Sequence, residues 1–220
     1  TKRILITGGA GFLGSHLCER FVKEDYHVMA MDNLITGDLK NIEHLFKLSN
    51  FEFYHHDVSK FVYVPGNLDY ILHFASPASP IDYLKIPIQT LKVSSLGTHN
   101  CLGLAKSKNA KILVASTSEV YGTALARPMT EEHLLNPLAP YAGAKAGADR
   151  LVYSYWSYAD LPALILRPFN NYGPQQHLEK MVPRFVTSAL KNEPLTIHGE
   201  GTAARDWIYV DDTCAGIDRA

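Results

Sequence analysis

The segment YAGAK places a phenol and an ammonium group four residues apart, as Tyr141 and Lys145. Residues at this spacing lie on one face of a helix. An unperturbed tyrosine has a pKa of about 10 and is a poor base at neutral pH, but a neighbouring cation favours its phenolate. Tyr141 is therefore a candidate general base that removes the proton of a substrate hydroxyl. The pattern is short, and a chance pair on an amphipathic helix is the alternative.

The segment STSEVYG, residues 116–122, adds hydroxyls and a carboxylate to this chemistry. It lies at the end of an expected strand, Lys111–Ser118, and ligands of parallel sheets collect at the carboxyl ends of the strands. Thr117 or Ser116 could hydrogen-bond the reacting hydroxyl, and Glu119 offers a second acid or base. For Glu119 the alternative is a solvated loop carboxylate.

A glycine-rich segment, TGGAGFLG, follows the apolar run Ile4–Ile6. A strand, a glycine turn and a helix form the arrangement in which a helix N-terminus binds a pyrophosphate. Gly8 would permit the sharp turn, Gly11 would let the backbone approach the phosphates, and Gly14 would let the helix lie close to the sheet. The spacing G-x-x-G-x-x-G differs from the common G-x-G-x-x-G fingerprint, and a tight loop without a ligand is the alternative.

An acidic residue stands where a dinucleotide site needs one. Asp32 ends the second expected strand, 18 residues after Gly14, and its carboxylate could bind both ribose hydroxyls and repel a 2′-phosphate. The sequence thus favours NAD over NADP. By position at the strand ends, Asp57 and Val58 should lie near the adenine, and Phe74–Ser76 near the middle of the cofactor. The cofactor-binding candidates are Gly8, Gly11, Phe12, Leu13, Gly14, Asp32, Asn33, Asp57, Val58, Phe74, Ala75, Ser76, Ser116, Tyr141 and Lys145.

These residues need a sheet to position them, and short β-rich runs do alternate with helical patterns. Several runs are continuously apolar, which is typical of strands covered on both faces. The sequence predicts an α/β fold of Rossmann type, a doubly wound parallel sheet with helices on both faces. A change of texture near Phe169 predicts a domain boundary there. The expected strands are Arg3–Thr7, His27–Asp32, Phe51–Asp57, Leu68–Ser76, Lys111–Ser118 and Pro162–Pro168, and the expected helices follow the first glycines to about Glu24 and span Pro87–Ser107 and Pro140–Tyr158.

Composition narrows the function classes. The 220 residues carry a formal net charge of −1, so no basic surface argues for nucleic acid or anionic lipid. The three cysteines are widely spaced without a C-x-x-C pair and are expected to be free thiols of a cytoplasmic protein. No apolar run is long enough to cross a bilayer, and no metal site is expected, since His55 and His56 lack suitably spaced partners.

Together the motifs resemble the extended short-chain dehydrogenase/reductase family, the NAD-dependent epimerases, dehydratases and decarboxylases of nucleotide sugars. The glycine motif, Asp32-Asn33, TSEVYG, Y-x-x-x-K, RPFNNYGP from Arg167 and GEGTAARDWIYVDD from Gly199 occur in the family's order. The resemblance implies bound NAD, a nucleotide-sugar substrate and a homodimer paired through the helices Pro87–Ser107 and Pro140–Tyr158. It also implies an NAD-binding domain over residues 1–168 that carries the catalytic residues, and an incomplete nucleotide-sugar-binding region over residues 169–220.

Two groups within this family compete. The stretch from His73 to Asn100 is similar to UDP-glucuronate decarboxylases (UDP-xylose synthases), in which this loop lies against the sugar and residues matching Ser118, Glu119 and Arg205 are associated with decarboxylation. The second half resembles sugar-nucleotide 4,6-dehydratases, many of which have an aspartate in place of Ser118, although GDP-mannose dehydratases resemble this sequence in using T-S-E. Asn170 and Asn171 would contact the substrate phosphates and the nicotinamide region, or form a turn. The resemblance thus gives Ser79, Asn170, Asn171, Glu179, Lys180 and Arg205 as substrate-binding candidates, and Thr117, Ser118, Glu119, Tyr141 and Lys145 as catalytic ones.

The function that the resemblance favours is an NAD-dependent lyase that works through a transient 4-keto sugar, with UDP-glucuronate decarboxylation to UDP-xylose first. A 4,6-dehydratase acting on dTDP-glucose or UDP-N-acetylglucosamine and a 4-epimerase are the alternatives. An inactive NAD-binding scaffold and an NADPH-dependent reductase are further classes. The retained Thr117, Glu119, Tyr141 and Lys145 argue against the scaffold, and Asp32 argues against the reductase.

Overall fold

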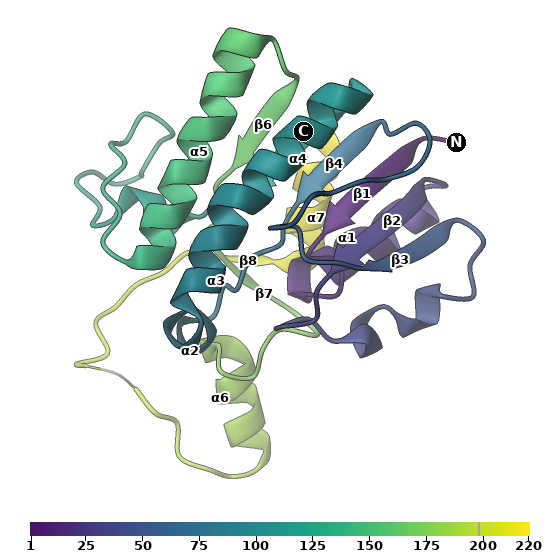
Figure 1. Ribbon diagram of the computed structural model, residues 1–220. Coiled ribbons are helices and arrows are strands. Elements are labelled where there is room, and N and C mark those ends of the chain that lie inside the picture. Colours follow the sequence, from purple (N-terminus) through teal and green to yellow (C-terminus); the bar gives the residue numbers. More distant parts are fainter. Residues whose placement is uncertain (198) are drawn as a thin grey trace. The chain divides into compact units, whose positions relative to one another are not determined.

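The structure is a computed structural model that describes residues 1–197 and 199–220 (Figure 1). The chain divides into two compact units, Thr1–Pro168 and Phe169–Ala220. The first unit contains the sheet, and the second contains a short strand pair with two helices.

The sheet of the first unit has six parallel strands in the order β3-β2-β1-β4-β5-β6. The chain runs outward from β1 in one direction and then restarts at β4 in the other, so the order reverses between these two strands. This is the doubly wound Rossmann arrangement, which confirms the expected fold class, and its ligand crevice lies at the reversal point. The strands are β1 Arg3–Thr7, β2 His27–Asp32, β3 Phe51–His55, β4 Tyr70–His73, β5 Lys111–Ala115 and β6 Ala163–Leu166.

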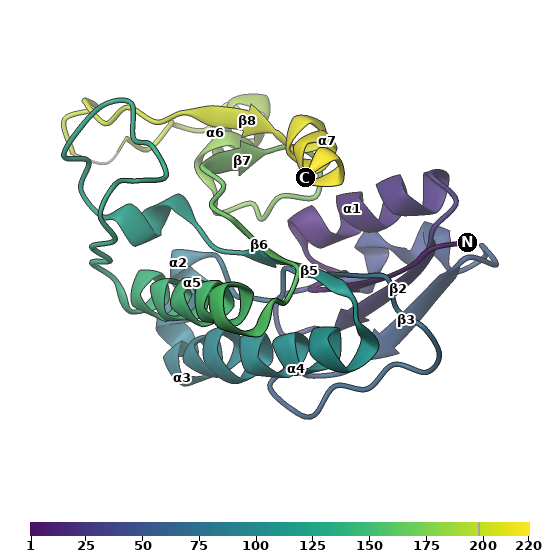
Figure 2. The ribbon, with the colours of Figure 1, turned by 90° about the horizontal axis from the view of Figure 1, so that it is seen from above.

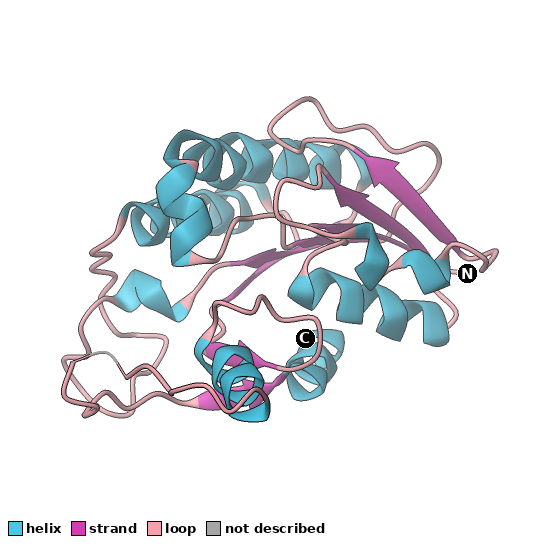
Figure 3. Ribbon diagram, turned by 90° about the horizontal axis from the view of Figure 1, so that it is seen from below, coloured by secondary structure: helices cyan, strands magenta, loops and turns pink. Residues whose placement is uncertain are grey.

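Helices cover both faces of this sheet. In Figure 2 α1, Phe12–Lys23, lies on one face, and α3, α4 and α5 lie on the other. Figure 3 shows the strands of this unit between the two helical layers. The second layer consists of α3 Pro87–Lys92, α4 Thr98–Lys108 and α5 Pro140–Ala159; the short α2, Pro80–Lys85, precedes it, and 3-10 turns occupy Leu39–Asn41, Glu43–Leu45 and Ser118–Tyr121.

Side chains from β1, β2, β4 and β5 form the core between these layers. Leu5, Met29, Ile71 and Ile112 are almost entirely buried, as the continuously apolar strand patterns predict. Burying one such side chain stabilises the fold by about 1.5–3 kcal/mol. Cys18, Cys101 and Cys214 are buried, and none of them forms a disulfide with another described residue.

The expected elements differ from the structure in two respects. The helix Pro87–Ser107 contains a π-helical turn, Val93–Gly97, where the chain needs a glycine because a Cβ at Gly97 would lie 3.0 Å from a methyl group of Val58. Four strands are shorter than expected, among them β6, which spans Ala163–Leu166 rather than Pro162–Pro168, since β-forming residue types continue past the last backbone pair. Thus β3 ends at His55 rather than Asp57, β4 spans Tyr70–His73 rather than Leu68–Ser76, and β5 ends at Ala115 rather than Ser118.

The second unit pairs β7 Asn170–Tyr172 with β8 Trp207–Tyr209 in parallel, and carries α6 Met181–Leu190 and α7 Val210–Arg219. Asn170 and Asn171 therefore lie in a strand, not in a turn. Gly173 follows β7 directly, and a Cβ there would lie 2.5 Å from a methyl group of Val210, so the start of α7 packs against this backbone. Within the described residues, every helix is too short or too polar to cross a bilayer.

Candidate active site

The glycine turn lies at the reversal point, between β1 and α1. Gly8 has a φ of +73°, and a Cβ there would lie 2.7 Å from the amide nitrogen of Ala75, which follows β4. A Cβ at Gly14 would overlap the carbonyl oxygen of Gly8, so α1 can lie this close to the turn only without a side chain. A Cβ at Gly11 would have one described atom within 4 Å, the carbonyl oxygen of Gly8 at 3.2 Å. Gly8 and Gly14 thus close the turn, and Gly11 leaves one side of it open.

Helix α1 begins at this open side. Its N-cap residue is Gly11, which provides no side-chain cap, and the following Phe12 and Leu13 are half-buried. The first N–H groups of a helix without a cap are available to an anion, and the helix dipole favours negative charge there. The turn therefore fits the pyrophosphate of a dinucleotide.

The carboxylate of Asp32 faces the same turn from the end of β2. Its Oδ2 accepts a hydrogen bond from the Ala10 amide at 3.1 Å, and its Oδ1 accepts one from the Leu34 amide at 2.8 Å. Burial raises the pKa of Asp32 above its ordinary value, although these backbone donors work to lower it. A carboxylate held in this way beside a phosphate turn fits recognition of ribose hydroxyls.

Asn33 and Asp57 extend this polar edge to β3. Burial works to raise the pKa of Asp57, but hydrogen bonds from Ser59 and from the Asn33 side chain outweigh it and lower the pKa. Val58 beside it is buried. Asp57 thus lies beyond the end of β3, in a turn, and still reaches the side chain that follows β2.

The residues after β4 are fastened to the end of β1. Phe74 donates its amide to the Thr7 carbonyl at 3.0 Å, and the Ala75 amide donates to the Thr7 hydroxyl at 3.3 Å. Phe74, Ala75 and Ser76 are all half-buried. The structure therefore brings the expected cofactor-binding residues of β1, β2 and β4 to one edge of the sheet.

Tyr141 and Lys145 lie on α5 and are both buried. The phenol of Tyr141 is hydrogen-bonded to Thr117, and its ring stacks on the ring of Tyr83 with centroids 5.0 Å apart and planes at 2°. Lys145 donates from Nζ to the Ala115 carbonyl at 2.8 Å. The helix pair thus reaches the end of β5, as its spacing predicts.

The turn after β5 supplies the other catalytic candidates. Thr117 caps this turn by accepting a hydrogen bond from the Glu119 amide at 3.3 Å, and the charge of Glu119 acts on Tyr141. Ser118 donates its amide to the Pro168 carbonyl at 3.0 Å. Ser116 is buried, and its hydroxyl has no hydrogen-bond partner among the described residues. Three of the five catalytic candidates, Thr117, Glu119 and Tyr141, therefore share direct or electrostatic contacts, and Lys145 donates to the end of the strand that precedes this turn.

Burial dominates the electrostatics of Tyr141 in the protein alone. A lysine cation should lower the pKa of the phenol, but burial raises it well above 10, and the charges of Glu119 and Tyr83 add to this. Burial also lowers the pKa of Lys145 to about 8, against the opposing charge of Asp149. In the protein alone, desolvation thus disfavours the charged form of both groups.

His73 lies next to this site at the end of β4. The Thr7 hydroxyl accepts from Ala75, so its own hydrogen is available to His73 Nδ1, 2.7 Å away. Complete burial, with the charge of Lys145, lowers the pKa of His73 to about 3. The imidazole is therefore neutral in the folded protein.

The neutral His73 should make stability depend on pH. Its pKa rises from about 3 in the folded protein to its ordinary 6.5 on unfolding, so the unfolded chain binds the extra proton first. Stability is complete above pH 6.5 and falls as the pH drops toward 3, by about 1.4 kcal/mol per unit from this group. Urea unfolding at several pH values should show a shallower slope for His73→Asn, which keeps an acceptor for Thr7. The same change at exposed His55 is the control, and an unchanged slope in His73→Asn would contradict the assignment.

Ser79 and Tyr83 belong to the segment around α2. Ser79 is buried at the N-cap of α2, and its carbonyl accepts from the Tyr83 amide at 3.0 Å. Because the Tyr83 ring stacks on Tyr141, this segment adjoins the candidate base. Sequence reasoning did not single out Tyr83. The only sequence signal for this residue is that it lies within the stretch from His73 to Asn100, which carries part of the family resemblance.

Asn170 and Asn171 are held by contacts within the second unit. Asn170 donates to the Asp206 carbonyl at 3.2 Å, and the Asn171 side chain accepts from the Thr213 hydroxyl. Arg205 is exposed, and its guanidinium donates to the carbonyl of Ala204 at 2.7 Å. The β7 asparagines and Arg205 thus lie near one another in this unit.

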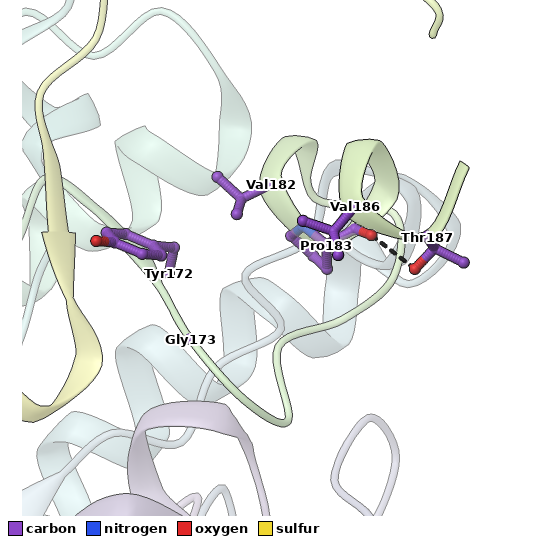
Figure 4. A pocket seen from close by; sticks show the side chains of 6 residues that line it. All are labelled: Tyr172, Gly173, Val182, Pro183, Val186 and Thr187. Atoms are coloured by element: carbon purple, nitrogen blue, oxygen red, sulfur yellow. Dashed lines mark hydrogen bonds between the residues drawn. The ribbon is translucent and has the colours of Figure 1, made fainter. Parts of the chain in front are cut away.

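Glu179 and Lys180 precede α6. Glu179 forms an ion pair with His177 at 3.5 Å, and Lys180 is the N-cap residue of the helix. An apolar hollow of about 250 Å³ lies between β7 and α6. Figure 4 shows Tyr172 on one side and Val182, Pro183, Val186 and Thr187 of α6 on the other. A flat, partly apolar ring such as a nucleobase would fit a hollow of this chemistry.

Sequence reasoning also missed a buried ion pair. Arg167 Nε donates to Asp149 Oδ2 at 2.8 Å. Asp149 follows Lys145 by one helical turn on the same face of α5, and this spacing was the signal that could have found it. Among the described residues, no three histidine, cysteine, aspartate or glutamate side chains are grouped so that they could hold a metal ion.

A six-stranded doubly wound sheet, an open glycine turn with an acidic residue after β2, and a tyrosine–lysine pair beside β5 define the class of extended short-chain dehydrogenases/reductases. Residues 5–220 match the family model described as GDP-mannose 4,6 dehydratase, and the chain belongs to this family.

Similar proteins include a UDP-glucuronic acid decarboxylase 1 from Xenopus tropicalis, 42% identical over 98% of this chain and 52% of its own length. UDP-glucuronic acid decarboxylase 6 from Arabidopsis thaliana is 40% identical over 99% of this chain and 65% of its own length. The chain thus spans only part of these relatives.

Solved structures agree with the fold. The dTDP-glucose 4,6-dehydratase from Bacillus anthracis, in complex with NAD, matches with a TM-score of 0.87 and 32% identity over 99% of this chain and 71% of its own. The UDP-glucuronic acid 4-epimerase from Bacillus cereus, in complex with UDP-glucuronic acid and NAD, matches with a TM-score of 0.88 and 32% identity, over 98% and 72% respectively.

Proposed function

We propose that the protein is an NAD-dependent nucleotide-sugar lyase and that its substrate is UDP-glucuronate, which it decarboxylates to UDP-xylose through a transient 4-keto sugar. The observation that carries this proposal is the phenol of Tyr141, hydrogen-bonded to Thr117 and within the field of Glu119. The identity of about 40% to UDP-glucuronic acid decarboxylases over nearly the whole chain supports the substrate.

We infer that residues 1–168 bind NAD. The open side of the turn at Gly11 would receive the pyrophosphate, and Asp32 would bind the ribose hydroxyls. The two solved neighbours with NAD support this inference. When bound there, NAD would supply a hydride acceptor and donor for the sugar carbon that is oxidised.

The protein's own part is proton transfer and positioning. Tyr141 takes the proton of the C4 hydroxyl, and Thr117 hydrogen-bonds the same oxygen. The cation of Lys145 favours the phenolate of Tyr141 once bound substrate and cofactor have changed the charges around it. The product of this step is a 4-ketone, which lies β to the C5 carboxylate. The C5–carboxylate bond then breaks, its electron pair enters an enolate as CO2 leaves, and a proton returns to C5. Ser118 and Glu119, on the adjoining turn, would orient the carboxylate and this proton.

Residues 169–220 would bind the nucleotide. The hollow beside Tyr172 and Val182 would take the base, and Arg205 would pair with the diphosphate as a charge-assisted fork. Asn170 and Asn171 would contact the phosphates and the nicotinamide region. Ser79, beside α2, would face the sugar.

A 4,6-dehydratase is the second candidate, and a 4-epimerase is a third. The matching dTDP-glucose 4,6-dehydratase structure and the Glu179-Lys180 pair favour dehydration. With a CH2OH group on C5, the 4-ketone acidifies the C5 hydrogen, which Glu119 would remove. The electron pair of that bond would form a C5–C6 double bond as the C6 hydroxyl leaves with a proton as water, and the hydride taken from C4 would then be delivered to C6 as a proton returns to C5. The presence of Ser118, where an acid would protonate the leaving hydroxyl, favours decarboxylation instead.

We also propose a cytoplasmic homodimer. Exposed apolar side chains on α3 and α5, among them Ile88, Leu91 and Trp156, support pairing through these helices. Sedimentation of the complete protein would test this assembly.

The function is tested by incubating the complete protein with NAD and, separately, UDP-glucuronate, dTDP-glucose and UDP-N-acetylglucosamine, and reading product masses. Loss of CO2 from UDP-glucuronate alone is the expected result. Loss of water from either other substrate would select the dehydratase, and no product from any of them, with NAD bound, would leave a scaffold and overturn the proposal.

A further inference from the structure

Arg167 makes three contacts just after β6. Its Nε donates to Asp149 Oδ2 at 2.8 Å, and its Nη1 donates to the Tyr121 hydroxyl at 3.0 Å. The guanidinium also lies over the Tyr121 ring, 5.3 Å from its centroid. The planar fork of an arginine can serve two acceptors at fixed angles, which a lysine cannot do.

The two partners of Arg167 belong to the two elements that carry the candidate catalytic groups. Asp149 lies on α5, two helical turns after Tyr141. Tyr121 ends the short turn Ser118–Tyr121, which contains Glu119. The guanidinium therefore connects the element of the candidate base with the element of the candidate second acid or base.

Other contacts also hold this turn, and the Tyr121 ring packs edge-on against His133 with centroids 5.5 Å apart. The backbone of the turn is joined to neighbouring segments by the bond from the Ser118 amide to the Pro168 carbonyl and by the bond from the Asn136 amide to the Val120 carbonyl. Both lie before its last residue. The contact from Arg167 to Tyr121 fixes the other end of the turn, toward α5.

The burial of the ion pair between Arg167 and Asp149 also supports a role in holding these two elements together. The Asp149 side chain is only 1% exposed and that of Arg167 14%. Desolvation makes such a pair a weak source of net stability, but it restricts the arrangements that the surrounding elements can adopt. The Oδ1 atom of Asp149 has no hydrogen-bond partner among the described residues. The bond from Arg167 to Oδ2 is therefore the hydrogen bond that orients this carboxylate. The charge of Asp149 also works to raise the pKa of Lys145, against burial.

We propose that Arg167 is a positioning residue that holds the turn of Glu119 in register with the helix of Tyr141 by bridging Tyr121 and Asp149. Its effect on catalysis rests on the proposed function, while its effect on geometry does not. The variants Arg167→Lys, which keeps the charge, and Tyr121→Phe, which keeps the ring and every charge, both weaken the bridge. Arg3→Lys is the matched control, because the Arg3 guanidinium likewise donates to more than one acceptor, the carbonyls of Pro65 and Asn67 and the sulfur of Met29, but lies at the start of β1 rather than beyond the end of a strand.

The first readout needs neither substrate nor cofactor. With 13Cζ-tyrosine labelling, the Tyr141 and Tyr83 resonances should show a chemical-shift step as Glu119 titrates, since its charge acts on both phenols. Glu119→Gln identifies the step by removing it. In Tyr121→Phe and Arg167→Lys this chemical-shift step should shrink by about half or more, because the field of the Glu119 charge at the two phenols weakens as the turn moves away from them. It should persist in Arg3→Lys.

The second readout is turnover of the substrate that the product assay identifies. Arg167→Lys should lower kcat about 10- to 100-fold with little change in KM, because misplacement of about 1 Å has effects of this size. Tyr121→Phe should lower kcat less, and Arg3→Lys should not lower it. If the folded Tyr121→Phe and Arg167→Lys proteins keep the full chemical-shift step, the bridge does not position the turn. If the step shrinks but no substrate reacts, the geometry stands and the proposed function fails.

Discussion

Replacing Tyr141 with phenylalanine should stop turnover while the protein remains folded and binds NAD. Loss of a general base lowers kcat about 10²- to 10⁴-fold, and here the same group is also needed to form the 4-ketone, so the upper end is expected. The ring stacked on Tyr83 is retained in phenylalanine, so packing changes little. Only the hydroxyl that contacts Thr117 is lost.

The measurement is single-turnover product formation together with NAD retained after gel filtration. Tyr153→Phe makes the same change on α5 at a position that is 48% exposed, and its rate should equal that of the natural protein. A Tyr141→Phe protein that turns over at a near-normal rate would remove this phenol from the mechanism. A protein that loses NAD as well as activity would assign the phenol to binding.

Local patterns predicted the elements that surround the dinucleotide turn. The ranges Arg3–Thr7 and His27–Asp32 match β1 and β2. Gly8, with a φ of +73°, follows β1 directly, and Leu34, with a φ of +60°, lies two residues after the end of β2. Strand ends without such a stop were placed too late, as at Asp57 and Ser76. Residue types describe β propensity, whereas a strand ends where the neighbouring backbone stops pairing.

The catalytic pair could be found from the sequence because Tyr141 and Lys145 are neighbours on one helix. Tyr83 and Arg167 could not be found in this way. Each meets its partner through tertiary packing, and 58 positions separate Tyr83 from Tyr141 in the chain. The contribution of burial to the Tyr141 pKa could not be seen from local spacing either, since burial is a property of the whole fold.

The charges of the site also depend on that burial. Burial lowers the pKa of Lys145 to about 8 and that of His73 to about 3, so each side chain loses its proton at a lower pH than it would in water. A bound phosphate or carboxylate would reverse part of this balance by adding negative charge. Substrate binding and protonation should therefore be linked at this site.

The second prediction with a large expected effect concerns the glycine turn, in which Gly14 allows close packing and Gly11 leaves space for a ligand. At Gly14 a Cβ would overlap the Gly8 carbonyl oxygen, so Gly14→Ala must push α1 away from the turn. We expect a loss of at least about 2 kcal/mol in the free energy of unfolding, since overpacking of this kind typically costs 1–3 kcal/mol. NAD binding should be lost with it, as the N-terminus of α1 moves.

Gly11→Ala separates binding from packing, because its Cβ would meet only the Gly8 oxygen, at 3.2 Å, and otherwise occupy the open side of the turn. That variant should stay nearly as stable as the natural protein and yet bind NAD at least about tenfold more weakly, a cost of about 1.4 kcal/mol. Gly103→Ala on α4 is the control, since a Cβ there has no described atom within 4 Å, and alanine in a helix should add about 0.5–1 kcal/mol of stability. Urea unfolding and calorimetric titration with NAD measure both quantities. If Gly11→Ala binds NAD as tightly as the natural protein, the pyrophosphate does not lie at this turn.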